Sequence, residues 1–375
     1  MSSQRRPGAH EARAVREHGD PLLSKILAEA LAQTGTEARA THGWHSYPAG
    51  LHPDAAAVML DAFDGPVHDP FCGGGTVLVE ARLAGRDCSG TDLSPIATLV
   101  SHARTAAAEH AVAMRAMSRH LAEAARRRVD VEVPELCVRW YEPHVAQELG
   151  RLRDGIKAVE PGPVQDLLRA LLSSIIVKSS FRESDTRNTR TPHHRPPGTT
   201  AILFHKKARE LARLLEAMPP GPAPRIRLAD ARKVGPPPGT RLVLTSPPYP
   251  GVYDYLPMQQ LRYAWLEIDP SPLMGGELGS RREFRSKGRT EALQHWREDN
   301  ARWIATQAQG LSADGWMAIV VGDGLVGDRL VDALQPTVVA MQEAGLQIVA
   351  RASADRPDHA REALRIEHLV LAHKP

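Results

Sequence analysis

One short segment restricts the fold of this chain more than any other: the sequence DPFCGGGT at residues 69–76. An apolar stretch, PVHDP, leads into it, three consecutive glycines follow, and a helical pattern begins at Val77. A second strand pattern, CSGTD, then ends at Asp92. This order is typical of the start of a doubly wound α/β sheet: a strand, a glycine turn, a helix, a second strand and an acidic residue. We therefore expect a Rossmann-like α/β fold.

Later segments predict the rest of such a sheet. RIRLAD (225–230), RLVLTSPPY (241–249) and WMAIVVGDG (316–324) are apolar strands with polar ends, and LQIVARAS and RIEHLVLAHK have the pattern of a terminal antiparallel pair. Between residues 104 and 220 the chain is alanine-rich and helical. The polar stretch 182–200 interrupts these helices, and its Ser, Thr, Asn and Pro content predicts an exposed loop.

These patterns divide the chain into four parts. A length of 375 residues fits two domains, or one α/β domain with an insertion. Residues 1–40 are expected to form an N-terminal arm, loosely held over its first 20 residues, and a helix. The remaining parts are 41–105, the first part of a cofactor-binding domain, 106–224, a mostly helical insertion with a basic loop, and 225–375, the second part of that domain.

The composition excludes several classes of protein. No run of about 18 apolar residues could span a membrane, and the polar N-terminus lacks the apolar segment of a secretory signal. Three cysteines without a CxxC pair exclude a disulfide framework and a four-cysteine zinc site. His45, His52 and His68 show no ligand spacing, so we interpret them as packing or surface residues and expect no metal. A reducing cytoplasm fits this cysteine usage.

The spacing of two aspartates indicates the cofactor. Asp92 follows Asp69 by 23 positions, which is about the distance at which an acidic residue binds the ribose of a nucleoside cofactor. The segment is neither GxGxxG nor a P-loop, so it does not suit a triphosphate. S-adenosylmethionine, a nucleoside without phosphate, fits best. The alternative is a glycine turn that only joins a strand to a helix.

The segment TSPPY (245–249) is the second chemical signal. Two prolines after a buried strand fix an extended backbone that cannot continue the ladder. Ser246 and the proline carbonyls could accept hydrogen bonds, and Tyr249 offers a flat face for stacking. The alternative is a proline turn with Tyr249 packed in the core.

Together, these segments resemble the two motifs of the amino-methyltransferases of nucleic acids. In that family DPFxGxGT binds S-adenosylmethionine, and [DNS]PP[YFW] holds the exocyclic amino group that receives the methyl group. Gly74 stands where the family often has serine, which we regard as a conservative difference. The SPPY form is most often associated with cytosine N4, and the motif order is like the family's alpha and gamma arrangements. The resemblance covers roughly 41–105 and 225–375.

The resemblance implies roles for single residues. Ser246 and the carbonyl of Pro247 would accept hydrogen bonds from the target amine, next to Pro248, and Tyr249 would stack on the extruded base. No cysteine nucleophile stands in the context that cytosine-C5 methylation requires. HSYPAGLHP (45–53) is similar to a segment that closes over the methionine end of the cofactor. The implied cofactor-binding residues are Tyr47, Asp69, Pro70, Phe71, Gly73, Gly75, Thr76, Asp92 and Asp230.

Two basic stretches, 182–200 and 281–289, could contact nucleic acid, because the planar guanidinium of arginine suits phosphate and base recognition. The formal net charge of only +3 decides little. For each stretch the alternative is a solvated charged loop. The expected contacts are Arg187, Arg190, Arg195, Arg281, Arg282 and Arg285.

The leading hypothesis is a site-specific DNA methyltransferase of the restriction–modification kind, with cytosine N4 favoured over adenine N6. An RNA amino-methyltransferase, acting on tRNA or rRNA, is the nearest alternative within this class. A catalytically silent S-adenosylmethionine-binding regulator and an enzyme for small molecules or peptides are alternatives from other classes.

Overall fold

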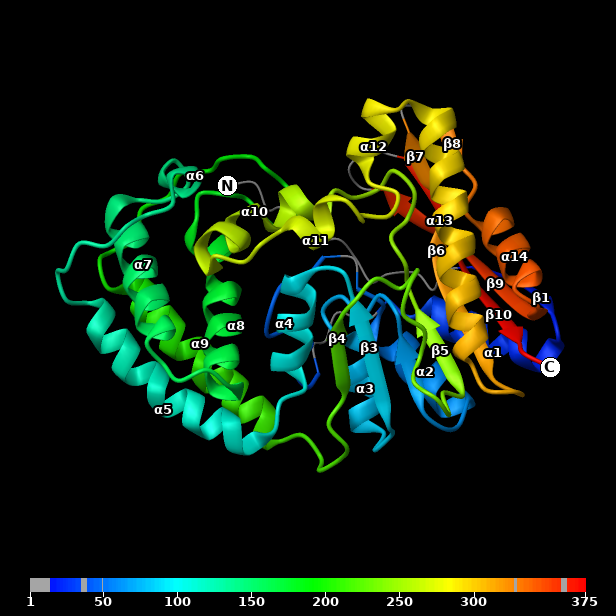
Figure 1. Cartoon of the computed structure of the whole chain (residues 1–375), viewed down its shortest axis with the longest axis horizontal. Helices are drawn as coiled ribbons and strands as arrows, with labels where there is room; N and C mark the ends of the chain where they lie inside the picture. The colour runs from blue at the N-terminus through cyan, green and yellow to red at the C-terminus, as the bar shows by residue number, and fades with distance from the viewer. Residues whose placement is uncertain (1–13, 35–38, 49, 327–328, 359–362) are drawn as a thin grey trace, which may run out of the picture.

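An eight-stranded sheet forms the centre of the computed structural model, in the part of the chain that it describes: residues 14–34, 39–48, 50–326, 329–358 and 363–375. The strands run in the order β1-β9-β10-β6-β5-β2-β3-β4 (Figure 1). Their bounds are β1 (Val15–Gly19), β2 (Val67–Asp69), β3 (Cys88–Asp92), β4 (Arg225–Leu228), β5 (Leu242–Thr245), β6 (Trp316–Gly322), β9 (Gln347–Asp358) and β10 (Ala363–His373).

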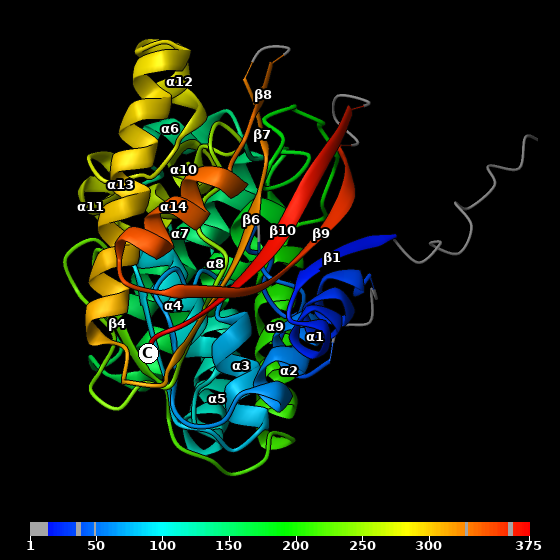
Figure 2. The same cartoon turned by 90° about the vertical axis from the view of Figure 1, so that its right-hand side faces the viewer.

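The strand order reverses beside β2. From β2 the chain moves outward through β3 to β4, then returns to the other side of β2 for β5 and β6, and all these neighbours pair in parallel. β10 and β9 complete the sheet as an antiparallel pair (Figure 2). In open α/β sheets ligands bind at the carboxyl ends of the strands, at the point where the order reverses. The expected Rossmann-like fold and the expected terminal pair are both confirmed.

Alternate residues of the central strands pack against helices on opposite faces of the sheet. Leu242 and Leu244 of β5 join the apolar cluster with α1, α2 and α3, while Val243 joins the cluster with α13 and α14. Because both faces are covered, all four residues of β5 are buried. These helices are α1 (Pro21–Ala32), α2 (Pro53–Ala62), α3 (Thr76–Leu83), α13 (Arg289–Gly310) and α14 (Leu334–Glu343).

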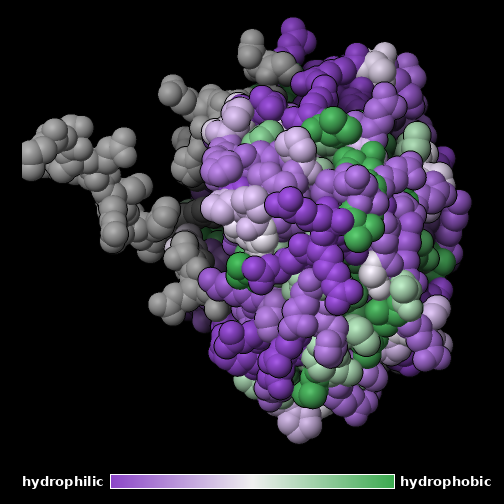
Figure 3. All heavy atoms as spheres, turned by 90° about the vertical axis from the view of Figure 1, so that its left-hand side faces the viewer, coloured by the Kyte–Doolittle hydropathy of each residue, from purple (hydrophilic) through white to green (hydrophobic). Residues whose placement is uncertain are grey.

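The segment between β3 and β4 forms a separate group of helices beside the sheet (Figure 1). They share one apolar cluster around α8, which is buried over most of its length. Figure 3 shows that the outer face of this group is mostly hydrophilic, with scattered hydrophobic residues. Its helices are α4 (Pro95–Arg104), α5 (Ala108–Ala125), α6 (Glu135–Val138), α7 (Pro143–Lys157), α8 (Pro163–Ser179) and α9 (Thr199–Glu216).

A third group of elements follows β5 and reaches over the carboxyl ends of the strands. The short helices α10 and α11 lie on the side of the helical group, and α12 lies near the β7–β8 hairpin (Figure 1). Their bounds are α10 (Tyr255–Leu266), α11 (Ser271–Met274), α12 (Arg281–Ser286), β7 (Gly324–Val326) and β8 (Arg329–Val331).

The structure corrects three expectations about local structure. Residues 15–19 pair with β9 at the edge of the sheet, so this part of the N-terminal arm is not loosely held; residues 1–13 lie outside the described residues. The basic stretch 281–289 contains the helix α12, which Ser280 caps through the N–H of Glu283, whereas a loop was expected. The sequence pattern after residue 324 predicts a helix over about 328–344, but α14 begins only at Leu334, after β8. No described helix is long and apolar enough to cross a membrane.

Candidate active site

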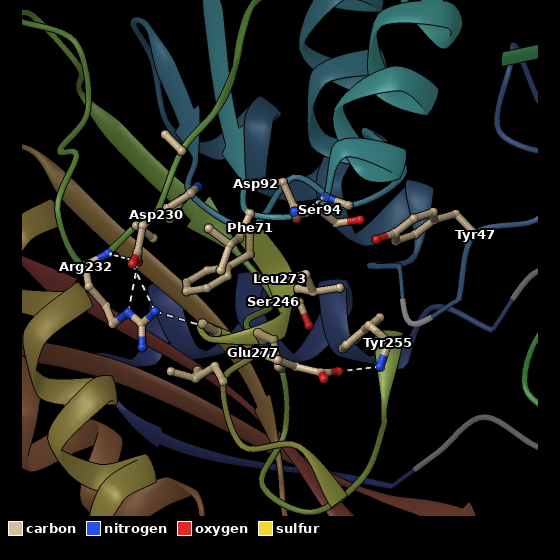
Figure 4. Close-up of a pocket in the computed structure, with 18 of the residues that line it drawn as sticks. Tyr47, Phe71, Asp92, Ser94, Asp230, Arg232, Ser246, Tyr255, Leu273 and Glu277 are labelled. Carbon is tan, nitrogen blue, oxygen red and sulfur yellow. Dashed lines mark hydrogen bonds and ion pairs between the residues drawn. The ribbon is translucent and has the colours of Figure 1, made fainter. Parts of the chain in front are cut away.

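A cavity lies beyond the carboxyl ends of β2, β3, β4 and β5. This is the place where a doubly wound sheet binds its ligand. Figure 4 shows Asp92 and Ser94 on one side of this cavity and Ser246 and Glu277 on another. The expected site residues that line it are Tyr47, Pro70, Phe71, Gly73, Asp92, Asp230, Ser246 and Pro248.

The glycine turn takes its shape from backbone angles that other residues rarely adopt. Gly73 has φ +48° and Gly75 has φ +82°, both in the left-handed region, and α3 begins directly after Gly75. A Cβ on Gly74 would lie 2.8 Å from the Arg104 guanidinium. A serine at position 74 would therefore require the Arg104 guanidinium to shift.

Asp92 lines the cavity from the end of β3. Its Oδ2 accepts a hydrogen bond from the Gly73 N–H at 2.9 Å, and its Oδ1 accepts one from the Ser94 N–H at 2.8 Å. Burial raises the pKa of Asp92 to about 6. Each oxygen keeps a free lone pair, so the carboxylate can accept hydrogen bonds from two vicinal hydroxyls.

Asp69 joins the two chemical motifs to each other. Its Oδ1 accepts hydrogen bonds from the Thr245 hydroxyl at 2.6 Å and from the Phe71 N–H at 3.1 Å. Burial raises the pKa of Asp69 to about 7. Asp69 does not line the cavity, and neither do Gly75 and Thr76. The structure therefore places Asp69 as a link between β2 and β5 behind the site.

Asp230 lines the cavity with both carboxylate oxygens engaged. Arg232 donates to Oδ1 and Oδ2 through Nε and Nη2, each at 2.9 Å, and also pairs with Asp299 at 2.7 Å. Burial opposes ionisation of Asp230, but the hydrogen bonds from Arg232 outweigh it and lower its pKa. The residue lies where we expected it, near the cofactor, but as half of an ion pair.

The tetrapeptide SPPY (246–249) follows β5 at the point where the strand order reverses. Ser246 and Pro248 face the cavity, whereas Pro247 and Tyr249 are not among its lining residues. Tyr249 packs instead against the end of β6, with its hydroxyl 2.8 Å from Glu367 of β10. The Tyr249 ring, which we expected to stack on the target base, therefore lies against β6 and β10 and is not among the residues that line the cavity.

Arg104 holds the segment before the glycine turn, a role that the sequence did not reveal. Its buried guanidinium donates to the carbonyls of Gly74, His42 and His45. Since these bonds join the turn to residues 42–45, they place Tyr47 at the cavity. Arginine is common in the last turn of a helix. The sequence around Arg104 therefore does not indicate that it joins residues 42–45 to the glycine turn.

The three histidines discussed above have structural partners. His45 is buried, and its Nε2 lies 2.9 Å from the hydroxyl of Ser173 in α8. His68 Nδ1 lies 2.8 Å from the Ser89 hydroxyl, and His52 caps α2. Within the described residues, no group of three His, Cys, Asp or Glu side chains is placed to hold a metal ion.

The segment after the tetrapeptide supplies a wall of the cavity that sequence reasoning missed. Glu277 accepts a hydrogen bond from the Tyr255 N–H, and its other oxygen pairs with Arg282 at 2.6 Å. Burial raises the pKa of Glu277. Tyr255 lines the cavity, whereas Tyr253 is not among its lining residues. Further lining residues from outside the two motifs are Leu93, Ser94, Arg232, Leu273 and Leu278.

The basic loop of the helical group makes several contacts within the protein. Arg182 is buried and donates to the Met258 carbonyl of α10 at 2.9 Å, so it is a structural residue. Arg190 lies 4.7 Å from the centre of the Phe181 ring. Arg187 is exposed and paired with Glu183 at 2.7 Å. Arg195 donates to a His193 ring nitrogen at 2.9 Å.

The arginines of α12 differ in exposure. Arg281 donates to the Val252 carbonyl, and Arg282 pairs with Glu277 beside the cavity. Arg285 points to solvent, while its neighbour Phe284 is buried. Arg281 and Arg282 thus hold the segment that forms the cavity wall, and Arg285 lies on the outside of the same helix.

Comparison with known proteins finds similarity over part of the chain. Residues 44–141 match the UPF0020 family, described as an RMKL-like methyltransferase domain. The chain is also 34% identical over 84 residues to the type II methyltransferase M.MvaI of Kocuria varians, a match covering 21% of this chain. The match covers 18% of that relative's length.

Solved structures with a similar arrangement are distant. A SAM-dependent methyltransferase from Methanosarcina mazei aligns with a TM-score of 0.34 and 8% identity, over 83% of this chain and 92% of that one. The rRNA methyltransferase aviRa of Streptomyces viridochromogenes aligns with a TM-score of 0.32 and 14% identity, over 88% and 89% of the two chains. TM-scores as low as these carry no argument, so the fold assignment rests on the strand order of the sheet.

The matched segment contains the glycine turn, Asp92 and the Tyr47 segment, which form one half of the cavity. The expected resemblance to nucleic-acid methyltransferases is thereby confirmed, and the cofactor of this class is S-adenosylmethionine.

Proposed function

We propose that this protein transfers a methyl group from S-adenosylmethionine to the exocyclic amino group of a base in DNA, with cytosine N4 as the favoured target. One observation carries the proposal: the SPPY tetrapeptide and the glycine turn open into the same cavity. Ser246 and Asp92 both line it, although 153 residues of the chain lie between them. The Asp69–Thr245 hydrogen bond joins the two motifs directly behind it.

The residues of the cavity fit the cofactor chemically. Phe71, Leu93 and Leu278 provide apolar surface for an adenine ring, while the Asp92 carboxylate can accept hydrogen bonds from a ribose. Gly73 brings its backbone to the cavity without a side chain. When bound, S-adenosylmethionine supplies a methyl group on a positively charged sulfur, and this sulfur keeps the bonding electron pair when the methyl group leaves.

The chain's own residues have to make a weak nucleophile reactive. The lone pair of a base amine is delocalised into its ring, and it becomes available when both N–H groups donate to well-placed acceptors. Ser246 Oγ, which lines the cavity, is the first acceptor that we assign. The second is the Pro247 carbonyl, which the resemblance implies although Pro247 is not among the lining residues. They stabilise the positive charge that develops on nitrogen, and the amine then loses one proton to solvent. The two prolines keep these acceptors fixed, so that most of the catalytic effect comes from positioning.

The preference for DNA and for cytosine is the finer part of the proposal. It rests on the SPPY form of the tetrapeptide and on the partial similarity to a type II methyltransferase. Arg187 and Arg285 are exposed on the loop 182–200 and on α12, where phosphates could reach them. The regulatory alternative is less favoured, because the tetrapeptide is intact in the sequence and its Ser246 and Pro248 line the cavity.

One experiment tests this proposal directly. The protein is incubated with isotopically labelled S-adenosylmethionine and separate DNA and RNA pools, which are digested and analysed as nucleosides by mass spectrometry. Labelled N4-methyldeoxycytidine is the expected product. Label in an RNA nucleoside would contradict the DNA assignment, and label in neither pool would contradict the function.

A further inference from the structure

We propose that Glu367 of β10 is a positioning residue for methyl transfer: acting through the Tyr249 hydroxyl, it turns the Ser246 hydroxyl so that its lone pairs face the target amine. This inference rests on the proposed function of the tetrapeptide. It concerns a residue outside both motifs, 121 positions (367 − 246) after Ser246 in the sequence.

The register of the sheet brings Glu367 to the tetrapeptide. β10 runs beside β6 (Figure 2), and in their ladder Glu367 lies directly opposite Gly322, the last residue of β6. Gly322 supports the Tyr249 ring, because a Cβ there would lie 2.5 Å from Tyr249 Cε2. The missing side chain at position 322 therefore makes room for the ring, and the neighbouring strand supplies the partner of its hydroxyl.

Three polar groups form a chain with a fixed direction. The Tyr249 hydroxyl donates to Glu367 Oε1 at 2.8 Å, and the Ser246 hydroxyl donates to the Tyr249 oxygen at 3.4 Å. An ionised carboxylate only accepts hydrogen bonds, so Tyr249 has to give its single proton to Glu367. The Tyr249 oxygen is then left as an acceptor, and Ser246 directs its own proton toward it.

This direction matters for the chemistry at Ser246. A serine hydroxyl can either donate or accept, but the substrate amine presents N–H groups and requires an acceptor. Once its proton is committed to Tyr249, the Ser246 oxygen has both lone pairs available at the cavity. Glu367 thus determines which way the hydrogen bonds run.

Two further features fix the position of the Glu367 side chain. Arg356 of β9 pairs with the same oxygen, Oε1, and only 9% of Glu367 is exposed. Burial and the neighbouring Glu367 raise the pKa of Tyr249 well above its usual value, so that the phenol remains a donor.

A double-mutant cycle tests this role. Glu367→Gln keeps the shape but allows its amide to donate, and Tyr249→Phe removes the hydroxyl while leaving the ring. Each change is expected to lower kcat on the order of tenfold, with KM for nucleic acid and the Kd of S-adenosylmethionine near their wild-type values. In a Ser246→Ala background Glu367→Gln should have no further effect on kcat, because no hydroxyl is left to orient.

The control is Asp355→Asn, which removes another carboxylate–arginine pair of β9, the one with Arg16 at 3.0 Å on the far strand β1. It is expected to leave kcat unchanged. Full activity in both Glu367→Gln and Tyr249→Phe would overturn the inference, as would an additive loss in the Ser246→Ala background. Tyr249→Phe keeps the Glu367–Arg356 pair, so it gives a result even if Glu367→Gln unfolds. The cycle requires an active wild-type protein, and an inactive one would count against the proposed function instead.

Discussion

The buried carboxyl of Asp92 gives cofactor binding a pH dependence that a single residue controls. Burial raises its pKa to about 6, so the group is neutral at pH 5 and charged at pH 8. Only the charged form offers acceptors on both oxygens to ribose hydroxyls. The affinity for S-adenosylmethionine should therefore fall as the pH drops through about 6, by up to roughly tenfold per pH unit below the pKa.

Calorimetric titration between pH 5 and pH 8 measures this effect, and Asp92→Asn provides the control. The asparagine variant should bind more weakly at pH 8 and lose the pH dependence. An equal slope in both proteins would show that another group is responsible and would remove Asp92 from the cofactor site.

At single positions, the sequence could predict residues whose type carries their chemistry. Asp92, Gly73 and Ser246 stand in recognisable motifs, and the structure brings all three to one cavity. Arg104 and Glu367 could not be predicted in this way. Their roles depend on what long-range packing places beside them, and an arginine in a helix or a glutamate in a strand carries no such information.

Among the elements, the basic loop 182–200 is the one whose role is most open to measurement. Its exposed Arg187 and Arg190 pair with a glutamate and with an aromatic ring, and neither contact is buried deeply enough to prevent contact with a phosphate. If the loop binds duplex DNA, the binding constant should fall as the salt concentration rises. In a plot of their logarithms, the slope should grow by about 0.9 for each phosphate that the protein neutralises.

Replacement of both arginines by alanine should reduce that slope by about 1 to 2, as measured by fluorescence anisotropy over a salt series. Arg302→Ala, an exposed arginine on α13, is the matched control and should leave the slope unchanged. An unchanged slope in the double variant would make the loop a solvated surface, which was the alternative interpretation of its charge.

Elements were predictable where the hydrophobic pattern was strong and local. The strands β5 and β6 are apolar on both faces and were expected, whereas β1 (VREHG) reads as a polar arm. β1 forms because β9 offers its edge for pairing, and an edge strand can expose most of its side chains. The helix α12 could not be recognised from its hydrophobic pattern either, because Phe284 is its only buried residue and most of the others are charged.

At the scale of the whole molecule, the strand order brings two distant motifs to one place. The motif order and the strand patterns predicted this, because consecutive strands on either side of β2 must leave their carboxyl ends together. The contacts of the helical group could not be predicted. Arg262 of α10 is buried against Asp185 of the basic loop and the Ser173 carbonyl of α8, so the helical group is joined to the segment that follows the tetrapeptide.

The proposed function requires the cavity to hold two ligands, with the tetrapeptide binding the amine and the glycine turn binding the cofactor. Ser246→Ala separates these functions. Removing one preorganised acceptor should lower kcat by about 100- to 1000-fold. Because the Asp92 side of the cavity is untouched, the Kd of S-adenosylmethionine should stay near its wild-type value.

Turnover and cofactor affinity, both measured on one Ser246→Ala preparation, therefore test whether the tetrapeptide and the glycine turn bind different ligands. A large loss of kcat with unchanged Kd is the result that we predict. Full activity would contradict the mechanism, and a loss of cofactor binding would show that the tetrapeptide serves the other ligand.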